Sequence, residues 1–566
     1  MLIVDFRPRR ATVCASALAL VLSAGCVRAE TLADAIALAY QNNPTLQQQR
    51  AVLRGLDEDY VQAEAGLRPT VTTQAYGTYT EQRYGKSTLD SDRTNELIAN
   101  PATKLQSNTV TGQIVVQQSL YTGGHVAAEL KTAMEEIKAG RQGLRAAEGD
   151  MILNVVEAYA SVRRDQAIVS VWRASVEQFL HQLDEAQARQ AAGDATKTDV
   201  EQARAQLEQE RASYASALQQ LEISRTSYAL YVGQNPGQLE PMPTLPGLPA
   251  NVDAAFERAE ADNPELAQAI LAEGTSRAEI ASARSAYRPT VTAQASYGYT
   301  GVMTPFYGRD LERDLSAQVV VSQPLFTGGL NASNVRKALE QNNADRNAVE
   351  ITRRQVVQNV ANYWNQMLTS RTTLENQARQ VVSARATYIG MQTEYRAGQR
   401  STFDVLYAEE VLRDAQISLL DAQHDAYVGE AAVVRYTGGL EASQLVADVP
   451  QYDPAANTRR VANVGGLPWD PLLQGLDGLG GPSSKQSPLT GPAISENPYV
   501  RAAKASIPAA GAPLVTAVPV QPILGSSASV TTPKTPLGLQ NATQADAMQQ
   551  LVDQAMHASA SDAPTQ

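Results

Sequence analysis

The chain has 566 residues, a formal net charge of −12 and an isoelectric point near 5.1, and this acidic balance excludes nucleic acid as an expected partner. Its four histidines, at positions 125, 181, 424 and 557, stand far apart, with no nucleophile motif, phosphate-binding loop or metal-ligand spacing. We therefore expect neither catalysis nor a cofactor.

Residues 1–29 are predicted to be a secretory signal peptide, because three arginines precede an apolar run and a small-x-small cleavage site ends at Ala29. Both cysteines, Cys14 and Cys26, lie in this segment, so cleavage after Ala29 leaves no thiol for a disulfide or a metal site. One alternative stays open. The sequence before Cys26 is similar to the end of a lipobox, whose cysteine is acylated, although Ser23 replaces the usual leucine.

Two copies of one unit make up most of the chain, at 30–235 and 252–440, joined by a linker at 236–251. The motif Arg68-Pro69-Thr70-Val71-Thr72 returns 220 residues later, and Leu120-Tyr121-Thr122-Gly123-Gly124 returns 205 residues later with Phe326 in place of tyrosine. We predict that each copy contains two short helices, two strands, and two long helices joined by a turn.

The strands are predicted at about 70–80 and 109–120, and again at about 290–300 and 315–325, from a period of two. Val291, for example, is followed by alternating polar and apolar residues, which gives one apolar and one polar face. The chain outside the signal lacks a run of roughly 18 apolar residues, so a membrane crossing would use β-strands. Their polar face would border the water-filled interior of a barrel. A half-buried soluble sheet is the alternative explanation.

The long helices are predicted at 124–191 and 196–232 in the first copy, and at 329–396 and 401–437 in the second. The first has no proline, so it can run for roughly 100 Å at 1.5 Å per residue. Heptad positions predict lengthwise coiled-coil packing in the shorter helix of each copy; they are Val200, Leu207, Tyr214, Leu221 and Tyr228, then Val405, Leu412, Leu419, Ala426 and Val433.

The tail, 441–566, contains 15 of the chain's 28 prolines among glycine, alanine and serine. This composition buries too little apolar surface to offset the entropy of ordering the tail. We expect its first part to wrap the helical body and the remainder to be largely disordered.

Four strands cannot close a barrel, and open sheet edges are not tolerated in lipid, so several chains must share one sheet. The fold class that follows is an α+β membrane protein, in which a trimeric twelve-stranded β-barrel is continuous with a long α-helical coiled-coil barrel. A barrel continuous with a helical tube forms a passive duct. The alternative, a structural periplasmic coiled-coil protein, would not explain the duplicated strands.

From Thr31 to about Leu440 the sequence resembles the TolC family of outer-membrane exit proteins. The resemblance rests on the opening Leu32-Ala33-Asp34-Ala35-Ile36-Ala37-Leu38-Ala39, on Asn43-Pro44, and on the duplicated Arg-Pro-Thr strand entries, Thr-Gly-Gly strand exits and helical tips. It implies a homotrimer in outer-membrane lipid with a periplasmic helical barrel. It also implies docking to a periplasmic membrane-fusion adaptor and to an inner-membrane pump, either of the ABC type or proton-driven.

The resemblance further implies a periplasmic gate at the inner tip, where the side chain of Asp404 would join a three-fold carboxylate ring and form a possible cation site. Tyr407 occupies the position of a second acidic ring, which puts tight block by cations in doubt. No firm metal site follows.

Arg400 and Tyr395 match family residues that hold the inner helix pair, and Thr198 and Asp199 match their partners on the outer pair. An exposed contact between Arg400 and Asp199 would be a latch of about 1 kcal/mol. The alternative is that Asp199 and Asp404 simply stabilise helix N-termini.

Gly193 and Gly398 stand where the long helices turn, and a positive φ explains both glycines. The resemblance implies that these tips also contact the adaptor. Cargo stays open between two classes. The Tyr-Gly-x-Tyr strands favour the type I protein secretion branch, and small-molecule efflux is the alternative.

Overall fold

The computed structural model describes residues 29–83, 104–303, 306–446, 450–462, 464–479, 481–487, 489, 498–505 and 507. All of them lie in a unit that runs from Met1 to Ala510. The predicted signal peptide up to residue 28, with both cysteines, lies outside the described residues, as do residues 84–103 between the first two strands and the tail beyond Ile507.

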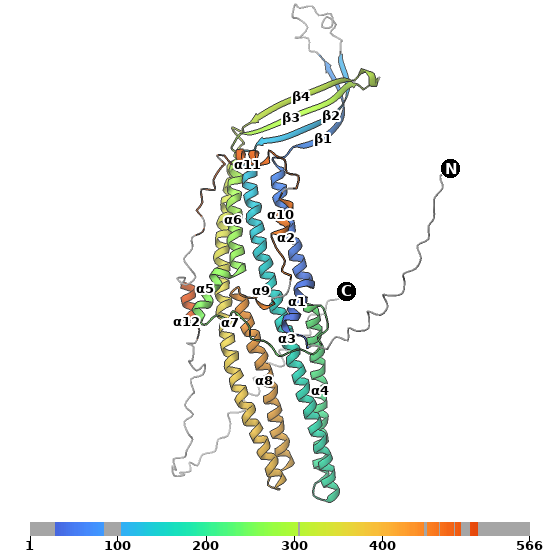
Figure 1. The fold of residues 1–566 in the computed structure, drawn as a ribbon, viewed down its shortest axis with the longest axis vertical. Helices are drawn as coiled ribbons and strands as arrows, with labels where there is room; N and C mark the ends of the chain where they lie inside the picture. Colours follow the sequence, from blue (N-terminus) through green and yellow to red (C-terminus); the bar gives the residue numbers. More distant parts are fainter. Residues whose placement is uncertain are drawn as a thin grey trace, which may run out of the picture. The chain divides into compact units, whose positions relative to one another are not determined.

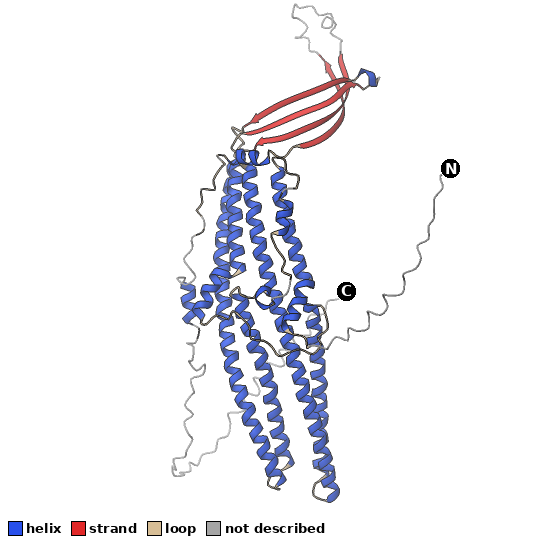
Figure 2. Cartoon of the chain, viewed as in Figure 1, coloured by secondary structure: helices blue, strands red, loops and turns tan. Residues whose placement is uncertain are grey.

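Both copies have the order helix, helix, strand, strand, helix, helix (Figure 2). The first contains α1 (Leu32–Asn42), α2 (Pro44–Ala65), β1 (Thr70–Arg83), β2 (Lys104–Tyr121), α3 (His125–Ala192) and α4 (Lys197–Val232). The second contains α5 (Val252–Asp262), α6 (Pro264–Ser285), β3 (Thr290–Val302), the short 3₁₀ helix η2 (Gly308–Asp310), β4 (Glu312–Ser322), α7 (Leu330–Arg396) and α8 (Thr402–Tyr436). The long helices end within one residue of their expected bounds.

Matched asparagines join the short helices to the long ones in both copies. The side-chain Oδ1 of Asn43 accepts hydrogen bonds from two amides at the start of α2, and its Nδ2 donates to the carbonyl of Tyr231 at 3.2 Å. Asn263 makes the same contacts at α6 and donates to the carbonyl of Tyr436 at 2.9 Å. Since proline follows each asparagine at the first helical position, the Asn-Pro pair both caps one helix and fixes it to another.

The four strands form one antiparallel sheet in the order β1-β2-β3-β4, so β1 and β4 are its edges (Figure 1). The duplication extends to the register: Thr70 pairs with Gln117 in the first hairpin, and their equivalents Thr290 and Ser322 pair in the second. The polar face repeats as well, because Gln113 donates to Gln74 at 3.1 Å and the equivalent Gln318 donates to Gln294 at 3.0 Å.

Two strands differ from the sequence-based expectation by more than three residues or at both ends. The second strand begins at Lys104 rather than near 109, because its register with β1 continues as far as Arg83. The fourth runs over Glu312–Ser322 rather than 315–325. Proline has no amide hydrogen to donate to a neighbouring strand, and Pro324 in the second copy replaces Ser119 of the first, which explains the early end.

The long helices pack as two hairpins, α3 with α4 and α7 with α8, and their tips lie at the opposite end from the sheet (Figure 1). Core residues come from both hairpins and from the short helices. They include Ile36, Leu53, Ile152, Tyr159, Tyr228 and Val434 in one cluster, and Phe256, Val356, Val360 and Val433 in a second. None of the helices in the described part of the chain combines the length and the apolar character that a bilayer crossing requires.

The start of the tail is ordered and lies against the helical body, as expected for its first part. It forms α9 (Ala442–Leu445), α10 (Ala456–Val461), α11 (Asp470–Gly478) and α12 (Pro498–Ala505). Apolar side chains such as Leu473 and Val500 are buried against the body, and polar contacts add to them. The carboxylate of Asp57 on α2 accepts hydrogen bonds from Asn457 and Thr458, and Arg68 forms an ion pair with Asp470 at 3.2 Å.

One residue of the tail completes the junction between the sheet and the helical body. Asp477 of α11, fully buried, accepts hydrogen bonds from the amides of Thr122, Gly124 and Ala127 at 2.6 to 3.2 Å. These amides lie at the start of α3, whose own N-cap Gly124 has no side chain to supply a cap. A carboxylate at this end is also favoured by the helix dipole.

Candidate channel gate at the hairpin tips

The two hairpin tips turn in the same way. Gly193 follows α3 with φ of 86°, and Gly398 lies two residues after the end of α7 with φ of 75°. In both tips the next amide returns to the helix, from Asp194 to the carbonyl of Arg189 and from Gln399 to that of Glu394, each at 2.9 Å. A Cβ on either glycine would meet no atom within 4 Å, so the positive φ alone requires glycine.

Each tip starts its second helix with a capping box. Thr196 and Asp199 exchange hydrogen bonds at the start of α4, and Ser401 and Asp404 do so at the start of α8. The hydrogen bonds from Ser401 lower the pKa of Asp404, and those from Thr196 lower the pKa of Asp199. Both carboxylates therefore stabilise helix N-termini and stay ionised at neutral pH.

Arg400 does not contact Asp199 within the described part of one chain. Its Nε donates to Oε2 of Glu394 at 2.8 Å, across the turn of its own tip, and both side chains are nearly half exposed. A contact between Arg400 and Asp199 of different copies stays a prediction.

A cleft of about 260 Å³ separates the two tips, and Asp199 and Arg400 both line it. The guanidinium of Arg189 on α3 lies 4.6 Å from the ring centre of Tyr395 on α7. Next to this cleft, on the side towards the sheet, Leu406 of α8 packs against Phe179 and Leu207 of the other hairpin. The structure thus brings three of the sequence-predicted residues, Tyr395, Arg400 and Asp199, to one interface between hairpins.

Three side chains beside the tips are exposed. Thr198 is exposed in the first turn of α4. Tyr407 is 59% exposed on α8, as is Phe403, one turn earlier, which sequence analysis did not single out. The i, i+4 spacing of these two aromatics around Asp404 was the available signal.

Above the tips, a polar network joins the hairpins and was missed by sequence analysis. Glu409 of α8 accepts a hydrogen bond from Gln182 of α3 at 2.8 Å. Arg413 forms an ion pair with the buried Glu210 of α4. Burial raises the pKa of Glu409 to about 7, with the charge of Glu210 adding to the rise and Gln182 and Arg413 opposing it.

Within the described ranges of a single chain, no three metal-ligating side chains come together. A cation site at Asp404 would therefore need the carboxylates of several copies. The arrangement of one chain offers charged groups, exposed aromatics and a separable helix interface, which suit a gate that opens by parting hairpins.

Sequence comparisons agree with this architecture. The family model described as outer membrane efflux protein matches residues 35–234 and 255–439, which cover both copies. Outer membrane efflux protein BepC of Brucella suis is 28% identical over 443 residues, covering 78% of this chain and 92% of that protein. Outer membrane protein TolC of Escherichia coli is 26% identical, covering 63% and 75%. Alkaline protease secretion protein AprF of Pseudomonas aeruginosa is 26% identical, covering 53% and 64%.

Solved structures share the fold. A membrane protein from Pseudomonas aeruginosa superposes with a TM-score of 0.61 at 21% identity, covering 72% of this chain and 93% of that one. The outer membrane protein VceC of Vibrio cholerae gives 0.58 at 21% identity, covering 72% and 96%. The resemblance to TolC and the fold class are therefore confirmed. The chain belongs to the outer membrane efflux protein family, and it is a non-enzymatic outer-membrane channel whose helices form the periplasmic part.

Proposed function

We propose that three copies form one exit duct of a tripartite transport system, with type I protein secretion as its main task. The duct carries cargo passively across the periplasm and the outer membrane. A periplasmic adaptor contacts the tips at Gly193 and Gly398, and an inner-membrane pump, of the ABC type for secretion, supplies the energy.

The observation that supports this assembly is the sheet with two open edges. Strands β1 and β4 are each paired on one side only in the described chain, and apolar side chains along both, such as Val71 and Leu315, are more than 60% exposed. In lipid every backbone polar group needs a partner, so β4 of one copy must pair with β1 of the next. Twelve strands then close above a ring of long helices.

The duplication supplies the register of that contact. Thr111 of β2 pairs with Thr300 of β3, with their hydroxyl oxygens 3.0 Å apart. Thr111 corresponds to Ser316 of β4, and Thr300 corresponds to Thr80 of β1. The same register between copies sets Ser316 opposite Thr80 of the neighbouring copy.

At the other end, the gate consists of Asp404, Arg400, Tyr395, Thr198, Asp199 and Tyr407. Three Asp404 carboxylates form the lumen ring, which attracts cations. Arg400 and Tyr395 hold the inner hairpin against Thr198 and Asp199 until the adaptor releases it.

Cysteine cross-linking tests the assembly, since the chain has no cysteine outside residues 1–29. Oxidation of the double variant Ser316→Cys/Thr80→Cys is expected to give covalently closed trimers. The control Ser316→Cys/Tyr79→Cys places the second thiol on the other sheet face, and little linkage is expected. Equal cross-linking in both variants, or none in either, would refute the register.

The names of the relatives support both candidate cargo classes, secreted proteins and small molecules. AprF is named for protease secretion, which supports the type I task, while BepC is named as an efflux protein, which favours efflux as the second candidate. Deleting the gene in its own bacterium separates them. Loss of specific proteins from the culture medium supports secretion, whereas unchanged secretion with lowered inhibitory concentrations of toxic compounds supports efflux.

A further inference from the structure

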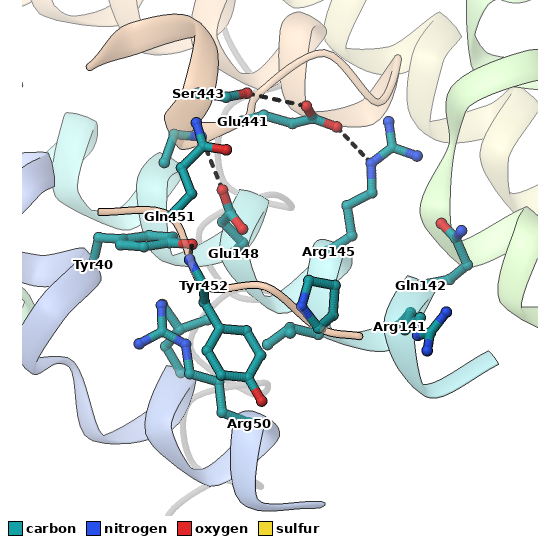
Figure 3. Close-up of a pocket in the computed structure, with 14 residues that line it drawn as sticks. Tyr40, Arg50, Arg141, Gln142, Arg145, Glu148, Glu441, Ser443, Gln451 and Tyr452 are labelled. Atoms are coloured by element: carbon teal, nitrogen blue, oxygen red, sulfur yellow. Dashed lines mark hydrogen bonds and ion pairs between the residues drawn. The ribbon is translucent and has the colours of Figure 1, made fainter. Parts of the chain in front are cut away.

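A cavity of about 270 Å³ lies where the start of the tail crosses the helical body (Figure 3). Its walls come from α1, α2 and α3, and the tail segment with Gln451, Tyr452 and Pro454 covers it. The cavity shares no lining residue with the cleft between the hairpin tips. Its charged lining consists of three guanidinium groups and two carboxylates, so one positive charge is in excess.

Arg50 of α2 is the most unusual residue of this cavity. Its side chain is buried, with 7% of the residue exposed, and its guanidinium lies between two aromatic rings, 4.6 Å from the centre of Tyr40 and 4.9 Å from that of Tyr452. Its Nε and Nη2 are buried and have no hydrogen-bond partner. These cation–π contacts hold the guanidinium in place but supply no hydrogen-bond acceptor to its Nε or Nη2.

The two unpartnered nitrogens lie on the same edge of the guanidinium. Their N–H groups point side by side in one plane, the geometry that accepts two oxygens of a carboxylate or a phosphate. A buried N–H without a partner keeps an uncompensated desolvation penalty, which is larger when the group is charged. An occupant with two oxygens would remove this cost.

The other charged groups of the cavity are partly committed. Arg145 forms an ion pair with Glu441 at 2.6 Å. Glu148 accepts a hydrogen bond from the amide of Ala442 at 2.9 Å, and it interacts with Arg50 only through their charges. Arg141 donates from Nη2 to Thr458, which leaves its buried Nε without a partner. Neither carboxylate therefore fills the open edge of Arg50.

The tail builds the site rather than merely covering it. The amide of Tyr452 donates to the hydroxyl oxygen of Tyr40 at 3.1 Å, which keeps both rings next to the guanidinium of Arg50. The buried Asp57 then holds the next residues of the tail through Asn457 and Thr458. A segment with this composition is ordered here because its polar groups are bound, and an ion in the cavity would add to that order.

We propose that this cavity binds a compact oxyanion, such as inorganic phosphate or a small carboxylate, with the Nε and Nη2 edge of Arg50 as its anchor. Arg141 contributes a further N–H, and the excess positive charge balances the ion. Tyr40 and Tyr452 are positioning residues that hold the guanidinium.

Equilibrium dialysis of the purified channel in detergent with labelled phosphate, and separately with labelled acetate, tests the proposal at constant ionic strength. Saturable binding of one ion per chain is expected for at least one probe. Arg50→Lys keeps the charge but loses the two-pronged edge, and should weaken binding by about tenfold or more. The matched control Arg54→Lys, on the exposed side of the same helix, should bind like the unmodified chain.

A second variant keeps the test decisive if Arg50→Lys fails to assemble. Tyr452→Ala leaves the arginine in place and removes one of the stacked rings, and should also weaken binding. Limited proteolysis near Gln451 should be slower with phosphate or acetate than with chloride. Absence of saturable binding for both probes, or equal binding by all variants, would overturn the proposal and leave a cavity filled by water.

Discussion

Arg413 of α8 forms a buried ion pair with Glu210 of α4, across the interface between the two hairpins. Their side chains are 8% and 2% exposed, and the guanidinium of Arg413 also lies 4.5 Å from the ring centre of Trp172 on α3. The residues are 203 positions apart, so this contact joins the second copy of the unit to the first. Any opening that parts the hairpins has to separate it.

Removing one partner of this pair should destabilise the closed channel. Arg413→Met leaves the carboxylate of Glu210 buried without a counter-charge, and we expect a loss of roughly 3–5 kcal/mol. Thermal denaturation of the purified trimer measures it. The control Arg204→Met removes an exposed pair with Glu201 and should cost under about 1 kcal/mol. Similar melting temperatures for the two variants would contradict this role.

The same interface should respond to pH through Glu409, whose pKa burial raises to about 7. When the hairpins part, the carboxyl of Glu409 returns to its ordinary pKa of 4.5. Protonation of Glu409 therefore stabilises the closed interface fully below pH 4.5, and this stabilisation is lost as the pH rises through about 7. Open probability should increase from pH 6 to pH 8, and Glu409→Gln should remove the increase. A pH response that survives in Glu409→Gln would assign it to another group.

Cation selectivity should depend on Asp404 but not on Asp199. Both residues occupy the same position in a capping box, so replacement by asparagine affects the two helix starts alike. Only Asp404 is proposed to face the lumen. Reversal potentials across a salt gradient should fall towards zero in Asp404→Asn and stay unchanged in Asp199→Asn. An equal effect in both would mean that the carboxylates act only as caps.

The partner of Arg400 can be identified by comparing two variants. Within one chain Arg400 pairs with Glu394, and the proposed latch pairs it with Asp199 of another copy. If the latch holds the gate, Arg400→Ser should raise the conductance while Glu394→Gln leaves it closed. If both variants open the channel equally, the pair within the tip is the one that matters.

The cap supplied by Asp477 should be important for stability. Asp477→Ala leaves the amides of Thr122, Gly124 and Ala127 without their acceptor at a buried helix start, and a loss of about 2 kcal/mol or more is expected. Asp34→Ala removes an exposed carboxylate that accepts hydrogen bonds from the amide and hydroxyl of Thr31 at the start of α1, and should cost about 1 kcal/mol. Hydrogen exchange at the start of α3 distinguishes the two variants. Unchanged protection there in Asp477→Ala would show that the tail is dispensable for this junction.

Local sequence patterns were sufficient to predict most of the fold. Self-comparison revealed the duplication, a period of two placed the strands, and the absence of proline predicted the long α3. The early end of β4 depends on a single residue, Pro324, which an average over the strand conceals. The tail was expected to wrap the body, but composition did not indicate which residues, such as Asp477, bind it there.

The gate region shows where local patterns stop being informative. Glycine and acidic residues indicated both tips, and the capping role of Asp199 and Asp404 was among the expectations. Arg413 could not be selected from the sequence, since its burial and its contact with Glu210 arise only when two distant hairpins pack together. The same holds for Arg50, which looks like an ordinary charged residue on an amphipathic helix until the tail covers it.

Single-channel recording of the purified protein in a planar bilayer tests the central claim most directly. Trimers closed by the Ser316→Cys/Thr80→Cys linkage should insert and conduct in discrete steps, with a preference for cations that Asp404→Asn reduces. A folded trimer that never conducts, under conditions in which Arg400→Ser is also silent, would contradict the assignment as a duct.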